Sequence, residues 1–348
     1  MARFLVTGGA GYVGSHTVLA LVERGDDVVV LDDLSQGHRG AVPPGVELIV
    51  EDIANTRRLQ EIFASWHFDG VLHFAARSLV GESMREPLLY LSENVSNTLR
   101  VAEAAIKSGC KRFVLSSTAA LFGMPDRIPI DEDSKLFPLS PYGESKLMAE
   151  KGLEWAHKIH GLHWSALRYF NAAGADPKGR LGEDHDPETH LIPLAINAAL
   201  GIGSELTVFG DKYDTIDGTA VRDYVHVTDL ADAHCRILDR LEAGHGGCYN
   251  VGNGTGYSVR QVIDAVERVS GRPVPHRIGP PRAGDPPVLV ASNERLRRDT
   301  GWSPRYASLD DIVSTAWAWR SSHPNGFDDA REKGSPPEGA AAPLAQAG

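Results

Sequence analysis

A glycine-rich turn near the N-terminus limits the possible folds more than any other stretch of the chain. Residues 3–7 form a short, β-rich apolar run that leads directly into glycines at positions 8, 11 and 14, and a helical pattern follows as far as Gly25. Glycines at these positions allow a tight turn, let backbone N–H groups approach a pyrophosphate and let the helix pack closely on the strand. The pattern therefore predicts a strand, a dinucleotide-binding turn and a helix, with Gly8, Gly11 and Gly14 at the cofactor.

Asp32 predicts which dinucleotide is bound. It ends a second apolar run, residues 28–31, and lies 18 residues after Gly14. An acid at this place accepts hydrogen bonds from a ribose 2′-hydroxyl and repels a 2′-phosphate, which favours NAD over NADP. Arg39 favours NADP instead, because a nearby arginine can accommodate the 2′-phosphate. We expect NAD.

Strand and helix patterns alternate up to residue 169. The predicted strands cover residues 46–50, 70–74, 112–116 and 165–169, and the predicted helices cover residues 56–66, 87–108 and 141–160. This rhythm predicts an α/β fold with a doubly wound parallel sheet of the Rossmann type. Such sheets bind ligands at the carboxyl ends of their strands. Candidates at these ends are Asp52, Ile53, Phe74, Ala75 and Thr118.

Tyr142 and Lys146 are the candidate proton-transfer pair. Their spacing places both side chains on one face of a helix that starts near Pro141. A free tyrosine has a pKa near ~10 and is a poor base at neutral pH. A positive charge at roughly 6 Å, with an effective dielectric constant near ~20, favours the phenolate by about two pKa units. We therefore expect Lys146 to lower the pKa of Tyr142.

The composition changes after residue 170. Loops rich in Gly, Pro and Asp follow, with one helix near residues 191–193 and a short strand at 206–209. We predict an NAD-binding domain over residues 1–170 with a return near 224–241, and a smaller mixed α/β substrate domain over 171–325. Residues 327–348 lack periodicity and are predicted to be a disordered tail.

Bulk composition limits the partners. The 348-residue chain has a formal net charge of −11, so it offers no overall basic field for nucleic acid or an anionic membrane. Its three cysteines are widely spaced, which fits reduced thiols in the cytoplasm, and we expect no metal site. The chain contains no run of 18 apolar residues, and its first strand begins too early for a signal peptide to precede it.

Six sequence blocks together resemble one superfamily. They are TGGAGYVG (residues 7–14), VGES (80–83), SPYGESK (140–146), LRYFN (167–171), VRDYVHV (221–227) and RAGD (282–285). With Thr118, these blocks resemble the extended short-chain dehydrogenase/reductase superfamily and, within it, the UDP-glucose 4-epimerases. The resemblance spans roughly residues 2 to 325.

The resemblance implies roles for individual residues. Tyr142, Lys146 and Thr118 are the implied catalytic residues. The implied NAD-binding residues are Gly8, Gly11, Tyr12, Val13, Gly14, Asp32, Asp52, Ile53, Phe74, Ala75, Asn94, Lys146 and Tyr169. The implied UDP-sugar residues are Asn171, Leu191, Phe209, Arg222, Arg282, Asp285 and Leu289. A homodimer that packs the helices around 87–108 and 140–160 is also implied.

The implied reaction is reversible inversion at C4 of a UDP-hexose through a transient 4-keto sugar. A 4,6-dehydratase needs an acid and a base after the threonine, where this chain has Ala119 and Ala120. A UDP-glucuronate decarboxylase is disfavoured because the glutamate expected at the same site is missing. A 4-epimerase of UDP-glucuronate, a UDP-pentose or a UDP-N-acetylhexosamine stays open, as does a non-catalytic NAD sensor.

The chain departs from the resembled pattern at three places. Thr118 stands where many relatives carry serine, which keeps the hydroxyl. Leu121 and Phe122 replace the commoner Val-Tyr, so one phenol is lost. Ser78 occupies the position of a cofactor-contacting lysine in some relatives, and neighbouring Arg77 is a candidate to compensate.

Overall fold

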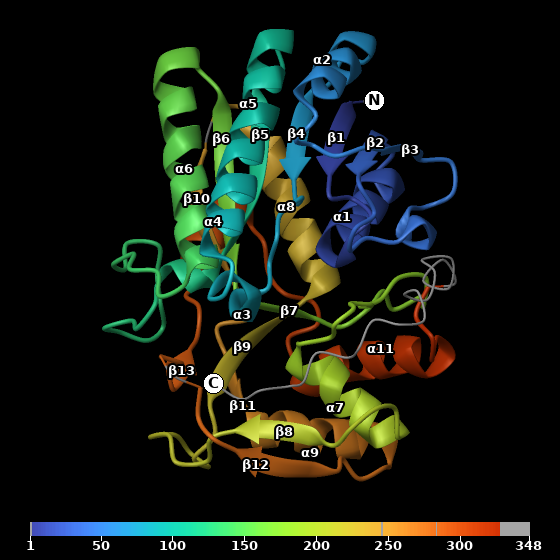
Figure 1. Ribbon diagram of the computed structural model, residues 1–348, viewed down its shortest axis with the longest axis vertical. Coiled ribbons are helices and arrows are strands. Elements are labelled where there is room, and N and C mark those ends of the chain that lie inside the picture. Colours follow the sequence, from blue (N-terminus) through green and yellow to red (C-terminus); the bar gives the residue numbers. More distant parts are fainter. Residues whose placement is uncertain (1, 245, 283, 328–348) are drawn as a thin grey trace.

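The computed structural model describes residues 2–244, 246–282 and 284–327 (Figure 1). Its largest element is a seven-stranded sheet in the order β10-β6-β5-β4-β1-β2-β3, in which all neighbouring strands are parallel. The strands are β1 (Arg3–Thr7), β2 (Asp27–Asp32), β3 (Glu47–Val50), β4 (Gly70–His73), β5 (Arg112–Thr118), β6 (His163–Tyr169) and β10 (Gly247–Val251). The predicted doubly wound parallel sheet is confirmed.

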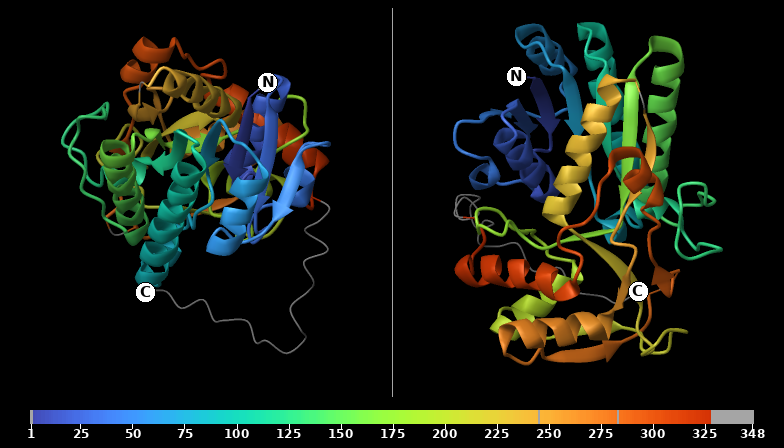
Figure 2. Two further views of the ribbon diagram at one scale, coloured as in Figure 1. Left: turned by 90° about the horizontal axis from the view of Figure 1, so that it is seen from above. Right: turned by 180° about the vertical axis from the view of Figure 1, so that it is seen from behind.

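Helices cover both faces of this sheet because its strands are apolar on both sides. Phe4 and Val6 of β1 face α1 (Tyr12–Glu23) and α8 (Val227–Glu242), whereas Leu5 faces the opposite layer. That layer contains α2 (Thr56–Ser65), α5 (Ser96–Ser108) and α6 (Pro141–His160). Figure 2 shows α8 lying along the sheet in the view from behind. The side chains of the central strands are therefore buried on both faces.

The strand order reverses beside β1, which pairs with β2 on one side and β4 on the other. The carboxyl ends of these strands open toward the second part of the molecule (Figure 1). Ligands of doubly wound sheets bind at this switch point. Short elements lie around it: η1 (Arg39–Ala41), α3 (Val80–Ser83), α4 (Pro87–Tyr90), η2 (Leu91–Val95) and η3 (Ala119–Leu121).

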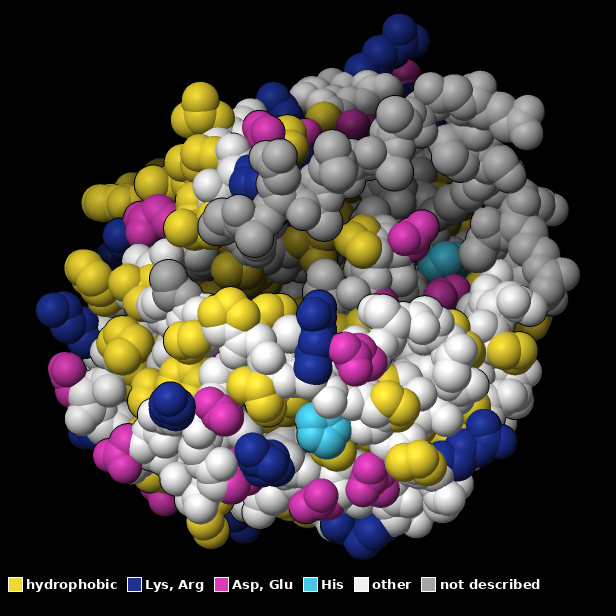
Figure 3. Space-filling view, turned by 60° about the horizontal axis from the view of Figure 1, so that its bottom comes forward, with side chains coloured by type: hydrophobic (Ala, Val, Ile, Leu, Met, Phe, Trp, Pro, Cys, Tyr) yellow, Lys and Arg dark blue, Asp and Glu magenta, His cyan; other side chains and the backbone are white. Residues whose placement is uncertain are grey.

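The second part of the molecule is smaller and mixed. A four-stranded sheet contains β7 (Asn171–Ala173), β9 (Val221–His226), β11 (Gly256–Ser258) and β13 (Val288–Leu289), and β8 (Leu206–Phe209) pairs with β12 (His276–Gly279). The helices α7 (Leu191–Leu200), α9 (Val259–Ser270) and α11 (Leu309–Ser322) bury a separate apolar core against these strands. Charged side chains of both signs are interspersed with apolar ones on the face shown in Figure 3.

β10 belongs to the large sheet, although the sequence grouped residues 171–325 with the second part. It pairs with β6 in parallel, and α8 precedes it on the sheet surface. The exact division into two domains therefore stays a prediction. Of the predicted tail, residues 328–348 lie outside the described residues, and Phe327 is buried beside Trp319.

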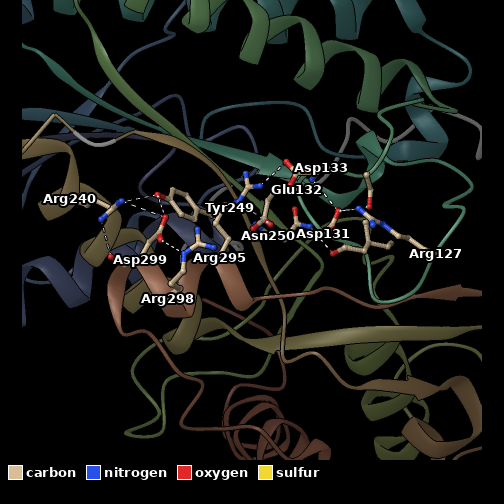
Figure 4. A network of polar contacts seen from close by, with 12 residues as sticks. Arg127, Asp131, Glu132, Asp133, Arg240, Tyr249, Asn250, Arg295, Arg298 and Asp299 are labelled. Atoms are coloured by element: carbon tan, nitrogen blue, oxygen red, sulfur yellow. Dashed lines mark hydrogen bonds and ion pairs between the residues drawn. The ribbon is translucent and has the colours of Figure 1, made fainter.

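A polar network ties β10 to the loop after η3 and to α10 (Glu294–Thr300) (Figure 4). Buried Glu132 accepts the backbone N–H of Asn250 at 2.8 Å, and its carboxylate lies 3.5 Å from the Arg295 guanidinium. Tyr249 donates to the carboxylate of Asp299 at 3.3 Å. The edge of the large sheet is thereby joined to the chain that leads back from the second part. Among the described residues, no helix is long and apolar enough to cross a membrane.

Candidate functional site

Two glycines of the turn are required by the chain itself. Gly8 has a φ of +71°, and a Cβ there would lie 2.4 Å from the backbone nitrogen of Ala75. A Cβ on Gly14 would lie 2.1 Å from the carbonyl oxygen of Gly8. Both separations are far below van der Waals contact, so a side chain at either position would push β1, α1 and the end of β4 apart. Gly8 and Gly14 thus set the close packing of strand and helix.

Gly11 has a different reason to be glycine. It is the N-cap of α1 and provides no side chain to cap the helix, and a Cβ there would meet only the Gly8 oxygen at 3.4 Å. The protein therefore has room for a side chain at this position. The first-turn N–H groups that follow, including those of Tyr12 and Val13, are free of a side-chain cap and suit an anion. The turn fits a dinucleotide pyrophosphate.

Asp32 is held beside the turn. Its carboxylate is almost fully buried at the end of β2 and accepts the backbone N–H groups of Ala10 and Leu34, each at 2.9 Å. Leu34 adopts a positive φ of 58° in this tight bend. Because both carboxylate oxygens are fixed by backbone donors, the acid is positioned before any ribose hydroxyl arrives.

The other predicted cofactor residues lie at neighbouring strand ends. The N–H groups of Phe74 and Ala75 both donate to the Thr7 carbonyl, which places the end of β4 against the glycine turn. Asp52 is exposed after β3, and its carboxylate accepts the N–H of Ala54 at 2.7 Å. Ile53, beside it, packs against the apolar core.

Asn94 lies in η2, which interrupts the predicted helix over residues 87–108. Its amide oxygen accepts the Arg77 N–H at 2.8 Å, and its amide nitrogen donates to the Arg77 carbonyl and to the hydroxyl of Ser145, each at 3.0 Å. These bonds connect the loop after β4 to the first turns of α6. Arg77 does not turn toward the site, because its guanidinium pairs with Glu93 at 2.5 Å.

Lys146 is buried near the start of α6, and Tyr169 at the end of β6 is partly buried. That helix begins after Ser140, whose hydroxyl accepts the N–H of Gly143 at 3.2 Å. The Lys146 ammonium donates to the Ser116 carbonyl at 3.1 Å, and the Tyr169 hydroxyl lies 2.7 Å from the Ser116 hydroxyl. Burial lowers the pKa of Lys146 to about 8. The lysine is therefore still mainly charged at neutral pH.

Burial raises the pKa of the Tyr142 phenol well above its ordinary value. Nearby Tyr169 raises it further, whereas a hydrogen bond from the Thr118 hydroxyl lowers it. The expectation that Lys146 lowers this pKa is not met in the structure, because the loss of solvation of the phenolate is the largest effect. Thr118 and Tyr142 are nevertheless brought together, with Tyr90 packed edge-on against Tyr142 at a centroid distance of 6.4 Å.

Glu150, one turn beyond Lys146 on α6, supports the lysine. It raises the pKa of Lys146, opposing the effect of burial. The same carboxylate accepts two hydrogen bonds from Arg168, at 3.0 and 2.6 Å, and one from Ser117 at 2.6 Å. Sequence reasoning missed Glu150 and Arg168, although the spacing of Tyr142, Lys146 and Glu150 along one helix face was a usable signal.

The predicted substrate residues lie in the second part of the molecule, in β7, α7, β8, β9 and β13 and in the loop before β13. Arg222 on β9 donates to the Asp285 carboxylate at 2.6 Å, and the Arg282 guanidinium stacks 4.3 Å from the ring centre of Phe209. Leu289 pairs in register with Arg222. It also packs against an apolar cluster that contains Ala119, Phe122, Ile130, Phe170 and Ala291. Asn171 opens β7 and Leu191 opens α7.

Residues 4–252 match the NAD dependent epimerase/dehydratase family. The chain belongs to this family. As a family member it uses NAD, and the predicted membership of the extended short-chain dehydrogenase/reductase superfamily is confirmed.

Individual members of the epimerase/dehydratase family cover nearly the whole chain. A UDP-glucose 4-epimerase of Halalkalibacterium halodurans is 48% identical over 324 residues, which are 93% of this chain and 97% of that protein. A crystal structure of a UDP-glucose 4-epimerase superposes with a TM-score of 0.92 at 44% identity, covering 94% of this chain and 99% of that one. A second, from Brucella ovis in complex with NAD, superposes with a TM-score of 0.89 at 43% identity, covering 91% and 98%.

Two matched substitutions in this epimerase/dehydratase distinguish the two kinds of glycine in the turn. Gly11→Ala is expected to leave the thermal unfolding temperature of the cofactor-free protein nearly unchanged but to weaken NAD binding at least about tenfold, because the methyl group occupies pyrophosphate space. Gly14→Ala is expected to lower that unfolding temperature markedly, because its Cβ overlaps the Gly8 oxygen. Thermal unfolding and NAD titration of both variants test this. Equal loss of stability in both would contradict the distinction.

Proposed function

We propose that this chain is a UDP-hexose 4-epimerase that interconverts UDP-glucose and UDP-galactose. The observation that carries the proposal is the convergence of Thr118, Tyr142 and Lys146 at the carboxyl end of β5, beside a turn that fits NAD. Sugar alcohol oxidation needs a proton acceptor and a hydride acceptor at one carbon; these side chains would supply the first, beside the turn that would hold the second.

In the proposed reaction, NAD held by the glycine turn would supply the hydride acceptor and a positive charge that favours the Tyr142 phenolate. Tyr142 takes the proton of the sugar 4-hydroxyl, and Thr118 hydrogen-bonds the same oxygen. Lys146, kept charged with the help of Glu150, would orient the nicotinamide ribose. The 4-keto sugar then rotates so that its other face meets the hydride donor, the hydride would return to C4 from that side, and Tyr142 gives the proton back to the oxygen. The two half-reactions cancel, so no net oxidation remains.

The UDP part of the substrate is assigned to the opposite wall. A diphosphate needs positive partners in a chain of net charge −11, and planar guanidinium groups suit it. Arg222 and Arg282 supply them, and Phe209 offers an aromatic face beside Arg282. Asp285, which accepts from Arg222 here, is assigned to the uridine ribose. Asn171 and Leu191 complete this wall.

The proposal is tested by incubating the purified protein with UDP-galactose without added NAD and separating the products. UDP-glucose is expected in a ratio that becomes constant with time, together with nicotinamide nucleotide released only when the protein is denatured. A cofactor that is reset in every cycle need not exchange, which is the reason to omit it. Absence of UDP-glucose even with added NAD would reject the proposal.

Other members of the same enzyme class differ at identifiable residues. A dehydratase would need acid and base side chains directly after Thr118, where Ala119 is buried and the Ala120 N–H donates to the Thr118 hydroxyl. A 4-epimerase of UDP-glucuronate, a UDP-pentose or a UDP-N-acetylhexosamine keeps the same catalytic residues, so the alternative lies in the sugar pocket. A turnover assay separates all of these from a protein that only senses NAD.

Leu289 is the residue by which we expect the sugar pocket to discriminate. UDP-galactose should be preferred and UDP-N-acetylgalactosamine should turn over slowly, because an aliphatic side chain can repack beside C2. In Leu289→Tyr, the larger ring should lower the ratio of kcat/KM for the N-acetylated sugar to that for UDP-galactose by about tenfold or more. The control is Val288→Ile, on the neighbouring strand position. No N-acetyl activity in the parent, or an unchanged ratio in Leu289→Tyr, would exclude Leu289 as the selective residue.

A homodimer and a cytoplasmic location complete the proposal. Apolar side chains are exposed along α5 and α6, namely Leu99, Met148, Trp155 and Ile159. Exposed apolar residues on two adjacent helices suit an interface between copies of the chain. Sedimentation of the purified protein measures its oligomeric state. All three cysteines are unpaired, as expected for a reducing compartment.

A further inference from the structure

Four side chains that carry metal-ligating groups converge in one loop. Glu183, His185, Glu188 and His190 lie in the loop between β7 and α7, and their nearest ligand atoms are all within 4.8 Å of one another. No metal site was predicted from the sequence, and no role was predicted for these four residues. Their spacing, E-x-H-x-x-E-x-H, gives alternating carboxylates and imidazoles over eight residues.

The contacts within the cluster are close but poorly aligned for hydrogen bonding. Glu183 Oε1 lies 2.7 Å from His190 Nδ1 and 3.3 Å from His185 Nδ1. Nevertheless, Glu183 Oε1 and His185 Nδ1 are both buried without a hydrogen-bond partner. The Glu183 side chain is only 6% exposed, so water cannot easily compensate its charge. Two carboxylates and two imidazoles that converge on one point suit a common cation.

Three of the four imidazole–carboxylate separations are close to the edges of a coordination tetrahedron, whereas the Glu183–His190 separation of 2.7 Å is shorter. For metal–ligand bonds of about 2.0–2.1 Å, tetrahedral geometry puts the ligand atoms roughly 3.3–3.4 Å apart. The two remaining imidazole–carboxylate contacts measure 3.6 Å, from His185 Nδ1 to Glu188 Oε2, and 3.3 Å, from His190 Nδ1 to Glu188 Oε1. We propose that Glu183, His185, Glu188 and His190 form a structural binding site for a divalent cation of the zinc type.

The alternative occupant of the cluster is a pair of extra protons, which would make both imidazoles cationic. The two rings are 5.2 Å apart between centroids, and two imidazolium charges there would be balanced by the carboxylates of Glu183 and Glu188. A single divalent cation neutralises both carboxylates and leaves both imidazoles neutral. Two imidazoles and two carboxylates are also ligands that Zn²⁺ accepts in tetrahedral sites.

Surrounding contacts hold the proposed ligands in place. Glu188 Oε1 accepts the backbone N–H groups of Thr189 and His190, at 2.7 and 2.8 Å, which orients the other carboxylate oxygen toward His185. The ring of Tyr12 meets that of His185 edge-on at 6.0 Å. A cavity of about 30 Å³ is lined in part by Glu183, His185 and Glu188.

A cation bound here would hold the glycine turn of the NAD-binding part and the start of α7 in a fixed relative position. Tyr12, in the glycine turn, donates to the Gly174 carbonyl at 2.6 Å at the start of the same loop, and Leu191 follows the last ligand directly. Binding a cation across residues 183–190 would fix the loop that joins these two contacts. The role is structural, so the expected effects concern metal content and stability.

Elemental analysis of the full-length protein tests the site. The protein is stripped with a chelator, equilibrated with Zn²⁺ and dialysed against metal-free buffer, and about one zinc per chain should remain. Zinc should raise the thermal unfolding temperature of the stripped protein by about 5 °C or more. His185→Gln and Glu183→Gln should retain almost no zinc and show no such rise. His190→Gln, at a half-exposed side chain, provides a variant with little risk to the fold.

The matched control is His67→Gln, which removes an exposed histidine remote from the cluster and should keep the full zinc content. As a second readout, Co²⁺ should give the intense visible absorption of a tetrahedral site in the parent and in His67→Gln, and not in the cluster variants. Zinc retention far below one per chain in the parent would overturn the proposal. So would equal retention by the cluster variants and His67→Gln.

Discussion

Replacing Tyr142 by phenylalanine is expected to lower kcat by about a thousandfold or more while NAD binding and the fold are retained. The phenylalanine ring keeps the edge-on contact with Tyr90, so packing at the start of α6 is preserved. What disappears is the only phenol hydroxyl that hydrogen-bonds Thr118 among the described residues. Without it, the proton of the sugar 4-hydroxyl has no acceptor. Steady-state assay with UDP-galactose and release of bound nucleotide measure the two effects.

The matched control for this experiment is Tyr90→Phe. The Tyr90 hydroxyl donates to Glu82 at 2.7 Å and accepts the Leu79 N–H at 3.0 Å, so its loss should cost stability but change kcat by less than about tenfold. If Tyr142→Phe keeps more than about a tenth of the activity, the assigned proton acceptor is wrong.

The largest effect on stability is expected from Glu150→Gln, which should lower the free energy of unfolding by about 3–5 kcal/mol. Glu150 and Arg168 are 4% and 6% exposed in their side chains and share two hydrogen bonds. Removing the negative charge leaves the arginine cation buried without its partner. It should also lower the pKa of Lys146 below about 8, because Glu150 is the group that raises it. Urea unfolding and the pH dependence of kcat measure the two consequences.

Glu154→Gln, one turn further along α6, is the control. Its ion pair with Lys158 has an N–O distance of 3.0 Å, but both side chains are about half exposed, so its loss should cost less than about 1 kcal/mol. A second comparison is the double variant Glu150→Gln with Arg168→Met, which removes both charges and should recover part of the lost stability. Similar losses of unfolding free energy in Glu150→Gln and Glu154→Gln would show that the buried ion pair contributes no more to stability than the exposed one.

Sequence reasoning found the features that are determined locally. Gly8 and Gly14 must be glycine because backbone atoms a few residues away, or at the end of β4, leave no room for a Cβ. The α6 residues Tyr142 and Lys146 follow from helix periodicity. The strands β1, β2, β4 and β6 were found within a few residues of their bounds, because buried parallel strands are continuous apolar runs.

Features that depend on distant chain segments were not predicted. The position of β10 at the edge of the large sheet depends on pairing with β6, more than 70 residues earlier. The Arg222–Asp285 bond joins β9 to a loop 63 residues away, a pairing that no local sequence pattern indicates. The pKa of Tyr142 was predicted in the wrong direction for the isolated protein, because the sequence shows the neighbouring charge but not the burial of the phenol.

The return of α8 and β10 to the first sheet also determines the order in which the chain can be completed on the ribosome. When residue 170 has emerged, one face of the large sheet has α1 but still lacks α8, so apolar side chains such as Val6 and Leu72 are only partly covered there. That cover is complete only at Glu242, about 70 residues later, which takes roughly 4–14 s at 5–20 residues per second. During this interval the nascent chain exposes part of its apolar core. The large sheet can therefore be completed only after β7, α7, β8 and β9 of the second part have been made.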